Sequence, residues 1–465
     1  MSKIQFGTDG WRAIIARDFT FDNLNRVTYA TGKWLFQFSE SPTVMLGYDC
    51  RFNGQLFAQA VANQLAQMGV HVFLTPGFSS TPMISLATAQ RQTTAGIIIT
   101  ASHNPPEYSG YKVKGGYGGP ATPAMVTDIE NLVPENPLSL DDKFEELIAQ
   151  RKIEYYDAEA LYINHLRQSF DLDAIRNSAM SIGYDAMYGA GQNVIRKLLP
   201  KATLLHCDYN PSFMGQAPEP IEKNLLSFEN LIREKKLTVG LATDGDADRI
   251  GLYDENAQFV DSHHIILLLI HYLFKYKKET GKVVCTFSCT SKVGKICQIY
   301  NLPLQVTKIG FKHICEIMIQ EKVLTGGEES GGISVLGHVP ERDGIYIGLM
   351  LMEFMAKTGK KLTELVHELY QVVGEFSVQR QDLHLSETLK QSIMSRCREN
   401  FYARFGEYQV TQVENLDGFK FWFSDSTWVM IRPSGTEPVL RIYAEGNSKQ
   451  QANDILEKTI ATVLA

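Results

Sequence analysis

The chain has 465 residues, 44% of them hydrophobic and 21% charged, and its 45 basic and 52 acidic side chains give a net charge of −7. This composition is typical of a globular protein and excludes collagen-like and disordered chains. The acidic balance also excludes a global positive field that would attract nucleic acid or an anionic membrane. At roughly 100 to 200 residues per domain, the length predicts about three or four domains.

Seven cysteines are scattered along the chain, odd in number and without a Cys-x-x-Cys pair. This pattern argues against a disulfide framework and against a zinc knuckle. The first residues contain no apolar stretch of the roughly 7 to 15 residues that a secretory signal needs. The most apolar later segment, residues 265–270, is much shorter than the roughly 20 residues of a membrane span. We therefore expect reduced thiols, a cytoplasmic location and no association with membranes.

Strands and helices alternate over most of the chain. Apolar runs that contain a glycine and end at an acidic residue predict buried strands over 44–49, 180–185 and 238–244. Helical periodicity between them predicts helices over 56–68 and 191–199. Three α/β units in succession follow from this alternation.

Changes in composition mark the ends of these units. A Pro-rich acidic stretch covers 133–142, a polar stretch covers 254–262, and a predicted helix ends at 370. The segment 419–446 then shows two aromatic or β-branched strands around a Pro-Ser-Gly-Thr turn, which predicts a small α+β domain. The predicted domains are 1–150, 151–256, 257–372 and 373–465.

The first loop that could take part in a reaction is residues 100–106, Thr-Ala-Ser-His-Asn-Pro-Pro, directly after the apolar run 96–99. The Asn-Pro-Pro break places Ser102 on an exposed, stiffened loop at a strand end. A phosphorylated serine would be a phosphoryl donor, and His103 and Lys112 could supply acid–base or cationic help. The alternative is an ordinary turn.

The second loop is Asp-Gly-Asp-Ala-Asp-Arg, residues 244–249, at the end of a predicted strand. Carboxylates at alternate positions, Asp244, Asp246 and Asp248, suit a hard cation such as Mg²⁺. An EF-hand would share this spacing, but it needs Gly where Arg249 stands. A phosphatase of the haloacid-dehalogenase type, with Asp244 as nucleophile, would expect Thr or Val in place of Asp248. A solvated acidic turn is the remaining alternative.

Two further loops could hold a sugar phosphate. Glycines flank Glu328 and Ser330 in the segment 326–332, and a carboxylate with a hydroxyl suits vicinal sugar hydroxyls. His338 follows shortly afterwards. The loop 432–438 combines Arg432 with hydroxyls and the N–H groups of a Gly-containing turn, which suits a phosphate. Plain turns are the alternative at both places.

In this order, the four loops resemble those of the α-D-phosphohexomutase superfamily of sugar-phosphate mutases. The opening segment 6–13 resembles that family's first loop, and similar matches occur at 47–51, 110–112, 187–191 and 308–312. The resemblance implies three similar α/β/α domains with mixed sheets, a smaller α+β C-terminal domain and an active site in the central cleft.

The resemblance also implies a role for each matched residue. Ser102 would be the phosphoserine and, with the three aspartates, would bind one Mg²⁺ per chain. The residues around the transferring phosphate would be Arg12, His103, Lys112 and Arg249, with Lys112 the better candidate for the general acid or base. The residues that bind the substrate would be Lys308, Glu328, Ser330, His338, Arg432, Ser434, Gly435 and Thr436.

The implied activity is the interconversion of hexose 1-phosphate and hexose 6-phosphate through a 1,6-bisphosphate, with glucose 1,6-bisphosphate as activator. The Glu-Glu-Ser sugar loop is more like that of glucose-phosphate enzymes, while mannose phosphate and glucosamine phosphate are alternative substrates. A Mg²⁺-dependent sugar-phosphate phosphatase and a non-catalytic sugar-phosphate sensor are the competing hypotheses. We expect a monomer or a homodimer whose only partner is a small sugar phosphate.

Overall fold

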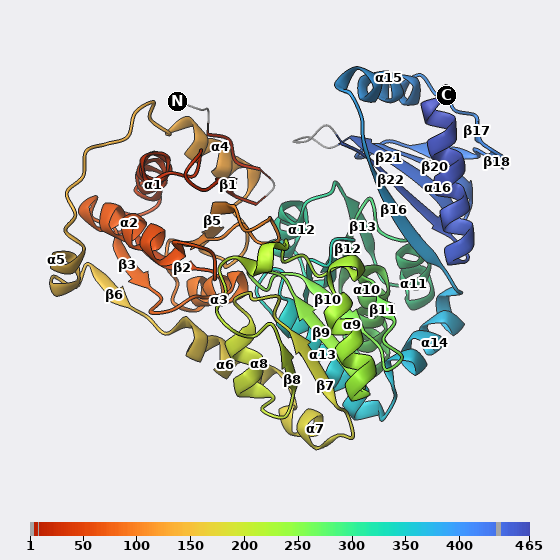
Figure 1. Cartoon of the computed structure of the whole chain (residues 1–465), viewed down its shortest axis with the longest axis horizontal. Helices are drawn as coiled ribbons and strands as arrows, with labels where there is room; N and C mark the ends of the chain where they lie inside the picture. Colours follow the sequence, from red (N-terminus) through yellow and green to blue (C-terminus); the bar gives the residue numbers. More distant parts are fainter. Residues whose placement is uncertain (1–3, 8, 434–438) are drawn as a thin grey trace. The chain divides into compact units, whose positions relative to one another are not determined.

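The computed structural model describes residues 4–7, 9–433 and 439–465 of the chain (Figure 1). The chain forms two compact units, of which the first contains residues 1–262 and 310–365 and the second residues 263–309 and 366–465. Within the described ranges, no helix is long and apolar enough to cross a membrane.

The first α/β/α domain contains a six-stranded mixed sheet in the order β1-β5-β4-β2-β3-β6. Strands β4, β2, β3 and β6 are parallel, whereas β5 is antiparallel to both β4 and β1. Its elements are β1 (Trp11–Ile14), α1 (Phe21–Leu35), β2 (Thr43–Tyr48), α2 (Gly54–Gln67), β3 (His71–Leu74), α3 (Thr81–Gln90), β4 (Ala95–Ile99), β5 (Tyr108–Gly115), α4 (Pro123–Asn131), α5 (Phe144–Ala149) and β6 (Ile153–Tyr155).

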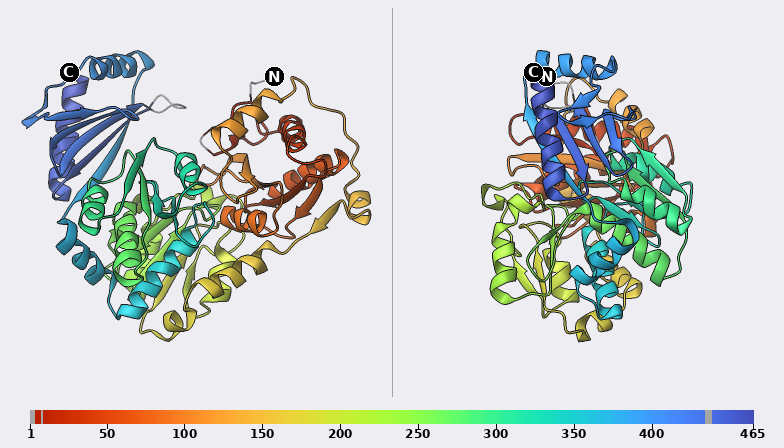
Figure 2. Two further views of the ribbon diagram at one scale, coloured as in Figure 1. Left: turned by 180° about the vertical axis from the view of Figure 1, so that it is seen from behind. Right: turned by 90° about the vertical axis from the view of Figure 1, so that its right-hand side faces the viewer.

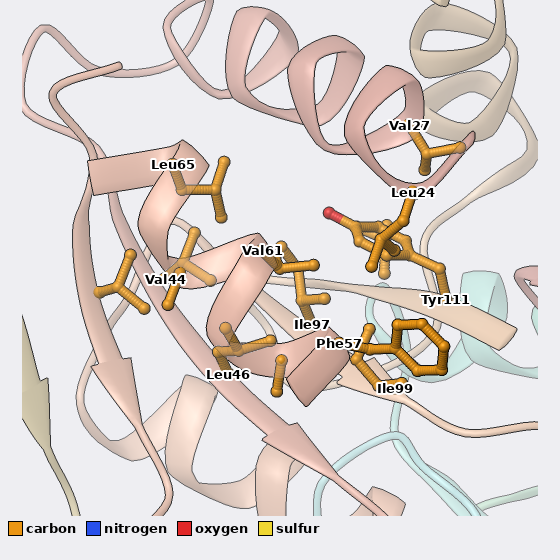
Figure 3. Close-up of a cluster of buried hydrophobic side chains, with 14 of the residues drawn as sticks. Leu24, Val27, Val44, Leu46, Phe57, Val61, Leu65, Ile97, Ile99 and Tyr111 are labelled. Carbon is orange, nitrogen blue, oxygen red and sulfur yellow. The ribbon is translucent and has the colours of Figure 1, made fainter. Parts of the chain in front are cut away.

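Helices cover both faces of this sheet because its central strands are apolar on both sides. Ile97 and Ile99 of β4 pack with Leu46 into the cluster beneath α1 and α2, which Figure 3 shows. Ile98 points to the opposite face, where it packs with Ile84 of α3. The period-2 alternation of side chains thus gives one strand two buried faces.

The second α/β/α domain has a five-stranded sheet in the order β11-β10-β9-β7-β8, in which β7, β8 and β9 are parallel and β10 and β11 antiparallel. Its apolar strand β9 leads into the aspartate-rich loop. Its elements are α6 (Ala158–Ser169), α7 (Leu172–Asn177), β7 (Ile182–Asp185), α8 (Gln192–Leu198), β8 (Thr203–Leu205), η1 (Phe213–Gly215), η2 (Glu222–Asn224), α9 (Leu226–Lys235), β9 (Val239–Thr243), β10 (Ile250–Tyr253) and β11 (Phe259–Val260).

The third α/β/α domain is divided between the two units. In the first unit, β14 pairs with β15 in antiparallel register; in the second, β12 pairs with β13 in parallel register. Its elements are α10 (Ser262–His271), η3 (Tyr272–Tyr276), β12 (Lys282–Thr286), α11 (Lys292–Tyr300), β13 (Leu304–Thr307), α12 (Phe311–Met318), β14 (Val323–Gly327), β15 (Ile333–Val335), α13 (Gly344–Thr358) and α14 (Leu362–Val373).

The C-terminal domain is a five-stranded antiparallel sheet in the order β16-β22-β21-β20-β19, and α16 runs along it (Figure 2). Ile455 of α16 packs with Ile442 of β22 in the core of this domain. Its elements are β16 (Ser377–His384), α15 (Glu387–Arg398), β17 (Arg404–Phe405), β18 (Tyr408–Gln409), β19 (Gln412–Glu414), β20 (Phe419–Ser424), β21 (Thr427–Pro433), β22 (Val439–Gly446) and α16 (Lys449–Leu464).

The predicted fold class is confirmed: three α/β/α domains with mixed sheets precede an α+β domain. The predicted strands correspond to β2, β7 and β9, and the predicted helices to α2 and α8. The polar stretch 254–262, which we expected to separate two units, contains a strand. Phe259 and Val260 form β11 and pair with β10. Residues 254–262 therefore complete the second sheet before α10 begins.

Candidate active site

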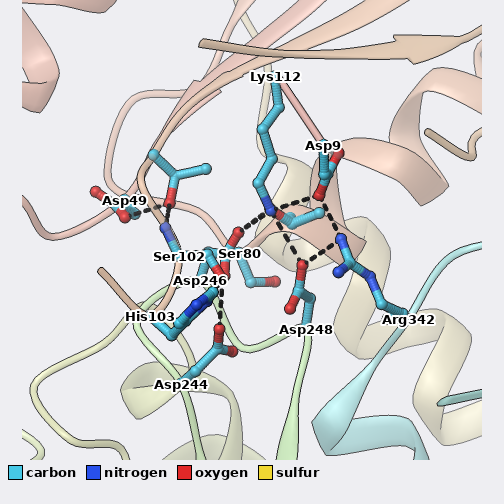
Figure 4. Close-up of polar contacts among 12 residues, drawn as sticks. Asp9, Asp49, Ser80, Ser102, His103, Lys112, Asp244, Asp246, Asp248 and Arg342 are labelled. Atoms are coloured by element: carbon cyan, nitrogen blue, oxygen red, sulfur yellow. Dashed lines mark hydrogen bonds and ion pairs between the residues drawn. The ribbon is translucent and has the colours of Figure 1, made fainter. Parts of the chain in front are cut away.

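Ser102 lies in the loop that follows β4, in a strained backbone conformation. Its φ of 53° is in the left-handed region, which costs a non-glycine residue of order 1 kcal/mol or more. The Ser102 N–H donates to Thr100 Oγ1 at 2.9 Å, and its hydroxyl donates to Asp244 Oδ2 at 2.7 Å. The side chain is directed at the aspartate loop (Figure 4). The prediction of an exposed loop is wrong for Ser102, because packing against the aspartate loop buries its side chain.

Arg51 holds this strained loop in place. Its buried guanidinium donates to the carbonyl oxygens of Ser102 and Asn104, at 2.7 and 2.6 Å. It also donates to those of Pro105 and Tyr108, at 2.8 and 2.9 Å. Sequence reasoning matched Arg51 to a family motif without giving it a task; the structure shows that it fixes the loop backbone.

Three buried carboxylates follow β9, in the loop that carries Asp244, Asp246 and Asp248. One oxygen from each lies within 4.8 Å of the others, a spacing that a single cation could bridge. Gly245 allows this loop to approach the serine loop, because a Cβ there would lie 2.5 Å from the carbonyl oxygen of Ser102. The sequence-predicted serine and aspartates thus meet in one cluster.

The oxygens of these carboxylates are unequally satisfied. Asp246 Oδ2 accepts from Thr81 Oγ1 at 2.5 Å and from Lys112 Nζ at 2.7 Å, and Asp248 Oδ2 lies 3.0 Å from Lys112 Nζ. In the part of the chain that the structure describes, Asp246 Oδ1 and Asp248 Oδ1 are buried without a hydrogen-bond partner. Buried carboxylate oxygens without donors are the hard ligands that Mg²⁺ prefers, so the residues fit this ion.

Lys112 stands at the centre of a buried ion network. Its ammonium contacts Asp246, Asp248 and also Asp9, at 2.9 Å. Burial opposes the charged form of Lys112, but these carboxylates outweigh it and raise its pKa above the ordinary value. Lys112 is therefore a permanent cation in this setting, which suits stabilisation of phosphoryl charge better than proton abstraction. Asp9 carried no predicted role.

The pKa values of Asp244 and His103 shift so that both favour the uncharged form. Burial and the neighbouring carboxylates of Asp246 and Asp248 raise the pKa of Asp244 well above its usual value. Burial and the nearby cations, Arg249 first among them, lower the pKa of His103 well below 6.5. Its Nδ1 lies 3.4 Å from Ser102 Oγ. A neutral imidazole beside the hydroxyl of Ser102 can accept a proton.

Two arginines approach the same loops. Arg12 on β1 donates to Asn104 Oδ1 at 2.7 Å, so it lies against the end of the serine loop. The backbone N–H of Arg249 donates to Asp244 Oδ1 at 3.0 Å, and its guanidinium lies 3.4 Å from Glu219. Both cations are available at the site where a phosphoryl group on Ser102 would need them.

The Gly-rich loop between β14 and β15 joins the aspartate loop through its backbone. Arg249 and Gly332 form an antiparallel bridge, and the N–H of Ile250 donates to the carbonyl oxygen of Gly331. Glu328 is buried and accepts from the N–H of Gly310 at 3.0 Å. Burial raises its pKa to about 7. Ser330 is half-buried in the same turn.

His338 lies in a different cluster. Its side chain is buried, with Nδ1 3.2 Å from His165 Nε2 and Nε2 3.0 Å from Asp343 Oδ2. The imidazole also stacks on the ring of Tyr346, with centroids 4.2 Å apart. Both ring nitrogens thus have their nearest polar neighbours outside the aspartate loop, and the substrate-binding role of His338 stays a prediction.

The remaining predicted residues belong to the second unit. Asp417 connects the segment of Lys308 with that of Arg432. Its carboxylate accepts from Arg432 Nε at 3.0 Å and from the N–H of Ile309 at 2.9 Å. Lys308, next to Ile309, is exposed. Ser434, Gly435 and Thr436 lie outside the described residues.

A strained serine hydroxyl, a carboxylate triad and fixed cations are the parts of a phosphoryl-transfer centre. Models of the phosphoglucomutase/phosphomannomutase family match nearly the whole chain: α/β/α domain I over 3–139, domain II over 160–257, domain III over 261–373 and the C-terminal domain over 395–462. The chain belongs to this family of the α-D-phosphohexomutase superfamily, and it is a phosphohexomutase, an isomerase that transfers a phosphoryl group.

Relatives and solved structures agree with this assignment. A phosphoglucomutase/phosphomannomutase of Thermococcus kodakarensis is 30% identical over 460 residues, covering 97% of this chain and 96% of its own. A phosphoglucosamine mutase of Limosilactobacillus reuteri is 29% identical with the same coverage. The structure of a candidate phosphomannomutase from Thermus thermophilus is 32% identical, covers both chains completely and gives a TM-score of 0.88. The fold is also shared by an N-acetylphosphoglucosamine mutase of Aspergillus fumigatus, solved in complex with GlcNAc-6P and magnesium, which is 16% identical, covers 100% of this chain and 96% of its own, and gives a TM-score of 0.59.

Proposed function

We propose that the chain interconverts glucose 1-phosphate and glucose 6-phosphate through a phosphorylated Ser102 and a glucose 1,6-bisphosphate intermediate. The observation that carries the mechanism is the hydroxyl of Ser102, held 2.7 Å from Asp244 within a buried carboxylate triad. The choice of glucose rests on the resemblance of the Glu328–Ser330 loop to that of glucose-phosphate enzymes.

The reaction would proceed in two transfers. Phospho-Ser102 donates its phosphoryl group to the free hydroxyl of the hexose monophosphate, which forms the bisphosphate; the bisphosphate then returns its other phosphoryl group to Ser102. His103 would take the proton of the attacking hydroxyl, because its imidazole is neutral. Lys112, Arg12 and Arg249 would stabilise the charge that develops on the phosphoryl oxygens.

The aspartate loop would hold the metal ion. Asp244, Asp246 and Asp248, together with the seryl phosphate, would bind one Mg²⁺, which supplies neutralisation of the phosphoryl charge. Glu328 and Ser330 would bind the sugar hydroxyls. Arg432 and Lys308, with Ser434, Gly435 and Thr436, would bind the phosphate that does not react.

The test is ³¹P NMR of the protein with Mg²⁺, a trace of glucose 1,6-bisphosphate and one sugar 1-phosphate per tube: glucose, mannose or glucosamine. We expect conversion to the 6-phosphate without free phosphate, fastest for glucose. Faster conversion of mannose 1-phosphate or glucosamine 1-phosphate would change the assigned substrate and leave the proposed mechanism intact. Release of inorganic phosphate would favour the phosphatase hypothesis.

Variants separate the two mechanisms. Ser102→Ala should abolish conversion and incorporation of phosphate into the protein, whereas Ser212→Ala, in an exposed loop, should behave as wild type. A phosphatase with Asp244 as nucleophile would keep its activity in Ser102→Ala. Full turnover by that variant would therefore refute the phosphoserine mechanism.

A further inference from the structure

Arg342 is a buried cation to which the sequence analysis assigned no role. It lies between β15 and α13, with its side chain only 6% exposed. Its neighbour Asp343 accepts from the N–H of Tyr346 and caps α13, while the N–H of Asp343 donates to the carbonyl oxygen of Ile333. The backbone on this side of Arg342 is therefore fixed by both a strand and a helix.

The surroundings of the Arg342 side chain leave it little freedom. Its methylene stem passes over Gly332, where a Cβ would lie 2.5 Å from Arg342 Cδ. The guanidinium lies over the ring of Phe311, with 5.4 Å between Cζ and the ring centroid. Arg342 Nε is also 3.5 Å from Glu341 Oε1. A planar guanidinium held on several sides loses little further entropy when it forms a hydrogen bond.

The guanidinium reaches two acids from distant parts of the chain. Arg342 Nη2 lies 2.8 Å from Asp248 Oδ2, and the same nitrogen forms an ion pair with Asp9 Oδ2 (Figure 4). Lys112 contacts these two carboxylates as well, but it is shared with Asp246 and is a point charge on a flexible stem. Of the two cations, Arg342 is the one with a fixed direction.

This contact determines which oxygen of Asp248 remains available. Oδ2 is occupied by Arg342 and Lys112, whereas Oδ1 has no hydrogen-bond partner among the residues that the structure describes. A carboxylate held by one oxygen presents the other in a defined direction, and groups that hold a ligand in this way typically affect metal affinity about 10- to 100-fold.

We propose that Arg342 is a positioning residue of the metal site, which holds Asp248 so that its Oδ1 is directed at the cation. Asp9 braces the guanidinium from the other side. The inference rests on the metal-binding role proposed above for the aspartate loop. It assigns to the third domain, which the sequence connected only with the sugar, a part in binding the metal.

Electrostatics alone would predict the opposite effect. A cation next to the site repels a divalent ion, so removing the charge of Arg342 should strengthen metal binding if charge were its only influence. If Arg342 acts by positioning Asp248, its removal weakens binding despite the lost repulsion. The sign of the change therefore separates the two explanations.

The experiment is a titration of the full-length protein with MnCl₂, followed by the electron paramagnetic resonance signal of free Mn²⁺. We expect Arg342→Gln to bind Mn²⁺ about tenfold more weakly than wild type, and Arg342→Lys, which keeps the charge but loses the fork, about threefold more weakly. The control is Arg233→Gln, which removes an exposed arginine that pairs with Glu229 on α9 and should leave binding unchanged.

Asp246→Asn separates this inference from the proposed function. If Asp246→Asn binds Mn²⁺ as well as wild type, the metal role of the loop itself fails. If Asp246→Asn loses binding while a folded Arg342→Gln binds as tightly as wild type or more tightly, only the role of Arg342 is overturned. If Arg342→Gln does not fold, the Mn²⁺ affinity of Arg342→Lys is the test. An affinity for Mn²⁺ equal to that of wild type in Arg342→Lys overturns the inference.

Discussion

Glu328→Gln should stabilise the protein at high pH while it removes activity. Burial raises the pKa of Glu328 from 4.5 to about 7, although Arg342 and the N–H of Gly310 favour the ionised form. As the pH rises from 4.5 to 7, the unfolded chain therefore loses the proton before the folded protein does. Stability is lost over this window, and the loss is complete above pH 7.

The magnitude follows from the size of the shift. At about 1.4 kcal/mol per pH unit, a shift from 4.5 to about 7 destabilises the folded protein by about 3 kcal/mol at pH 8. Glutamine has nearly the same shape and can still accept from the N–H of Gly310, but it carries no charge that must be buried. We expect the unfolding midpoint of Glu328→Gln to exceed that of wild type by several degrees at pH 8 and to match it near pH 4.5.

The assay is thermal unfolding of both proteins at pH 5 and pH 8, with Glu316→Gln as control because that carboxylate lies on α12 and is 39% exposed. If Glu328 binds the sugar hydroxyls as we propose, kcat/KM should rise through pH 7 for wild type, because ionisation of Glu328 strengthens the hydrogen bonds that it accepts, and should stay low for Glu328→Gln. Equal unfolding midpoints at pH 8 would refute the reasoning, since they would mean that burial of the charge costs nothing.

Three further predictions concern other buried groups. Arg51→Lys keeps a cation but cannot reach four carbonyl oxygens, so steady-state kinetics should show kcat about 10- to 100-fold lower with little change in KM; an unchanged kcat would contradict this. Because the pKa of His103 is lowered, ¹⁵N NMR of its imidazole should show no titration between pH 6 and 8, and a midpoint near 6.5 would be inconsistent with its burial. Glu445→Ala leaves the donors of Thr290, Ser291 and Trp428 without their shared acceptor. Urea unfolding should therefore show that the free energy of unfolding of the second unit falls by about 3 kcal/mol. A fall below about 1 kcal/mol would show that Glu445 does not stabilise this unit.

The residues of the candidate site that follow strand ends could be singled out from the sequence, and the structure brings them together. Ser102 follows β4 and Asp244 follows β9, and in each case a continuous apolar run, buried along its whole length, ends where the loop begins. The residue types then indicate the chemistry, because alternating carboxylates have few uses besides a cation. The alternation of strands and helices predicted the three α/β units, and the aromatic or β-branched strands of 419–446 predicted the α+β domain at the end of the chain.

The residues that hold the site together could not be predicted in this way. Arg342 and Asp9 are 333 positions apart, and no local pattern indicates that they form an ion pair. Arg51 donates to backbone carbonyl oxygens. Every residue type carries such an oxygen, so the sequence of the loop does not indicate this contact. Thr81 lies in the first turn of α3 and donates to Asp246. Its sequence neighbourhood indicates only the capped beginning of a helix, and not this contact. Such contacts depend on the tertiary fold and not on local spacing.

The charges of this network are consistent with the divalent ion that we propose for this site. Five carboxylates, those of Asp9, Asp244, Asp246, Asp248 and Glu341, face three cations, those of Lys112, Lys114 and Arg342. If all five carboxylates were ionised, the excess would be two negative charges, buried where water cannot screen them; the raised pKa of Asp244, which favours its uncharged form, reflects the cost of that excess. One Mg²⁺ matches this excess. A phosphoryl group on Ser102 would add about two negative charges, and Arg12 and Arg249 are the cations that remain beside it. The proposed metal ion and the proposed phosphoserine would therefore each meet opposite charge at this site.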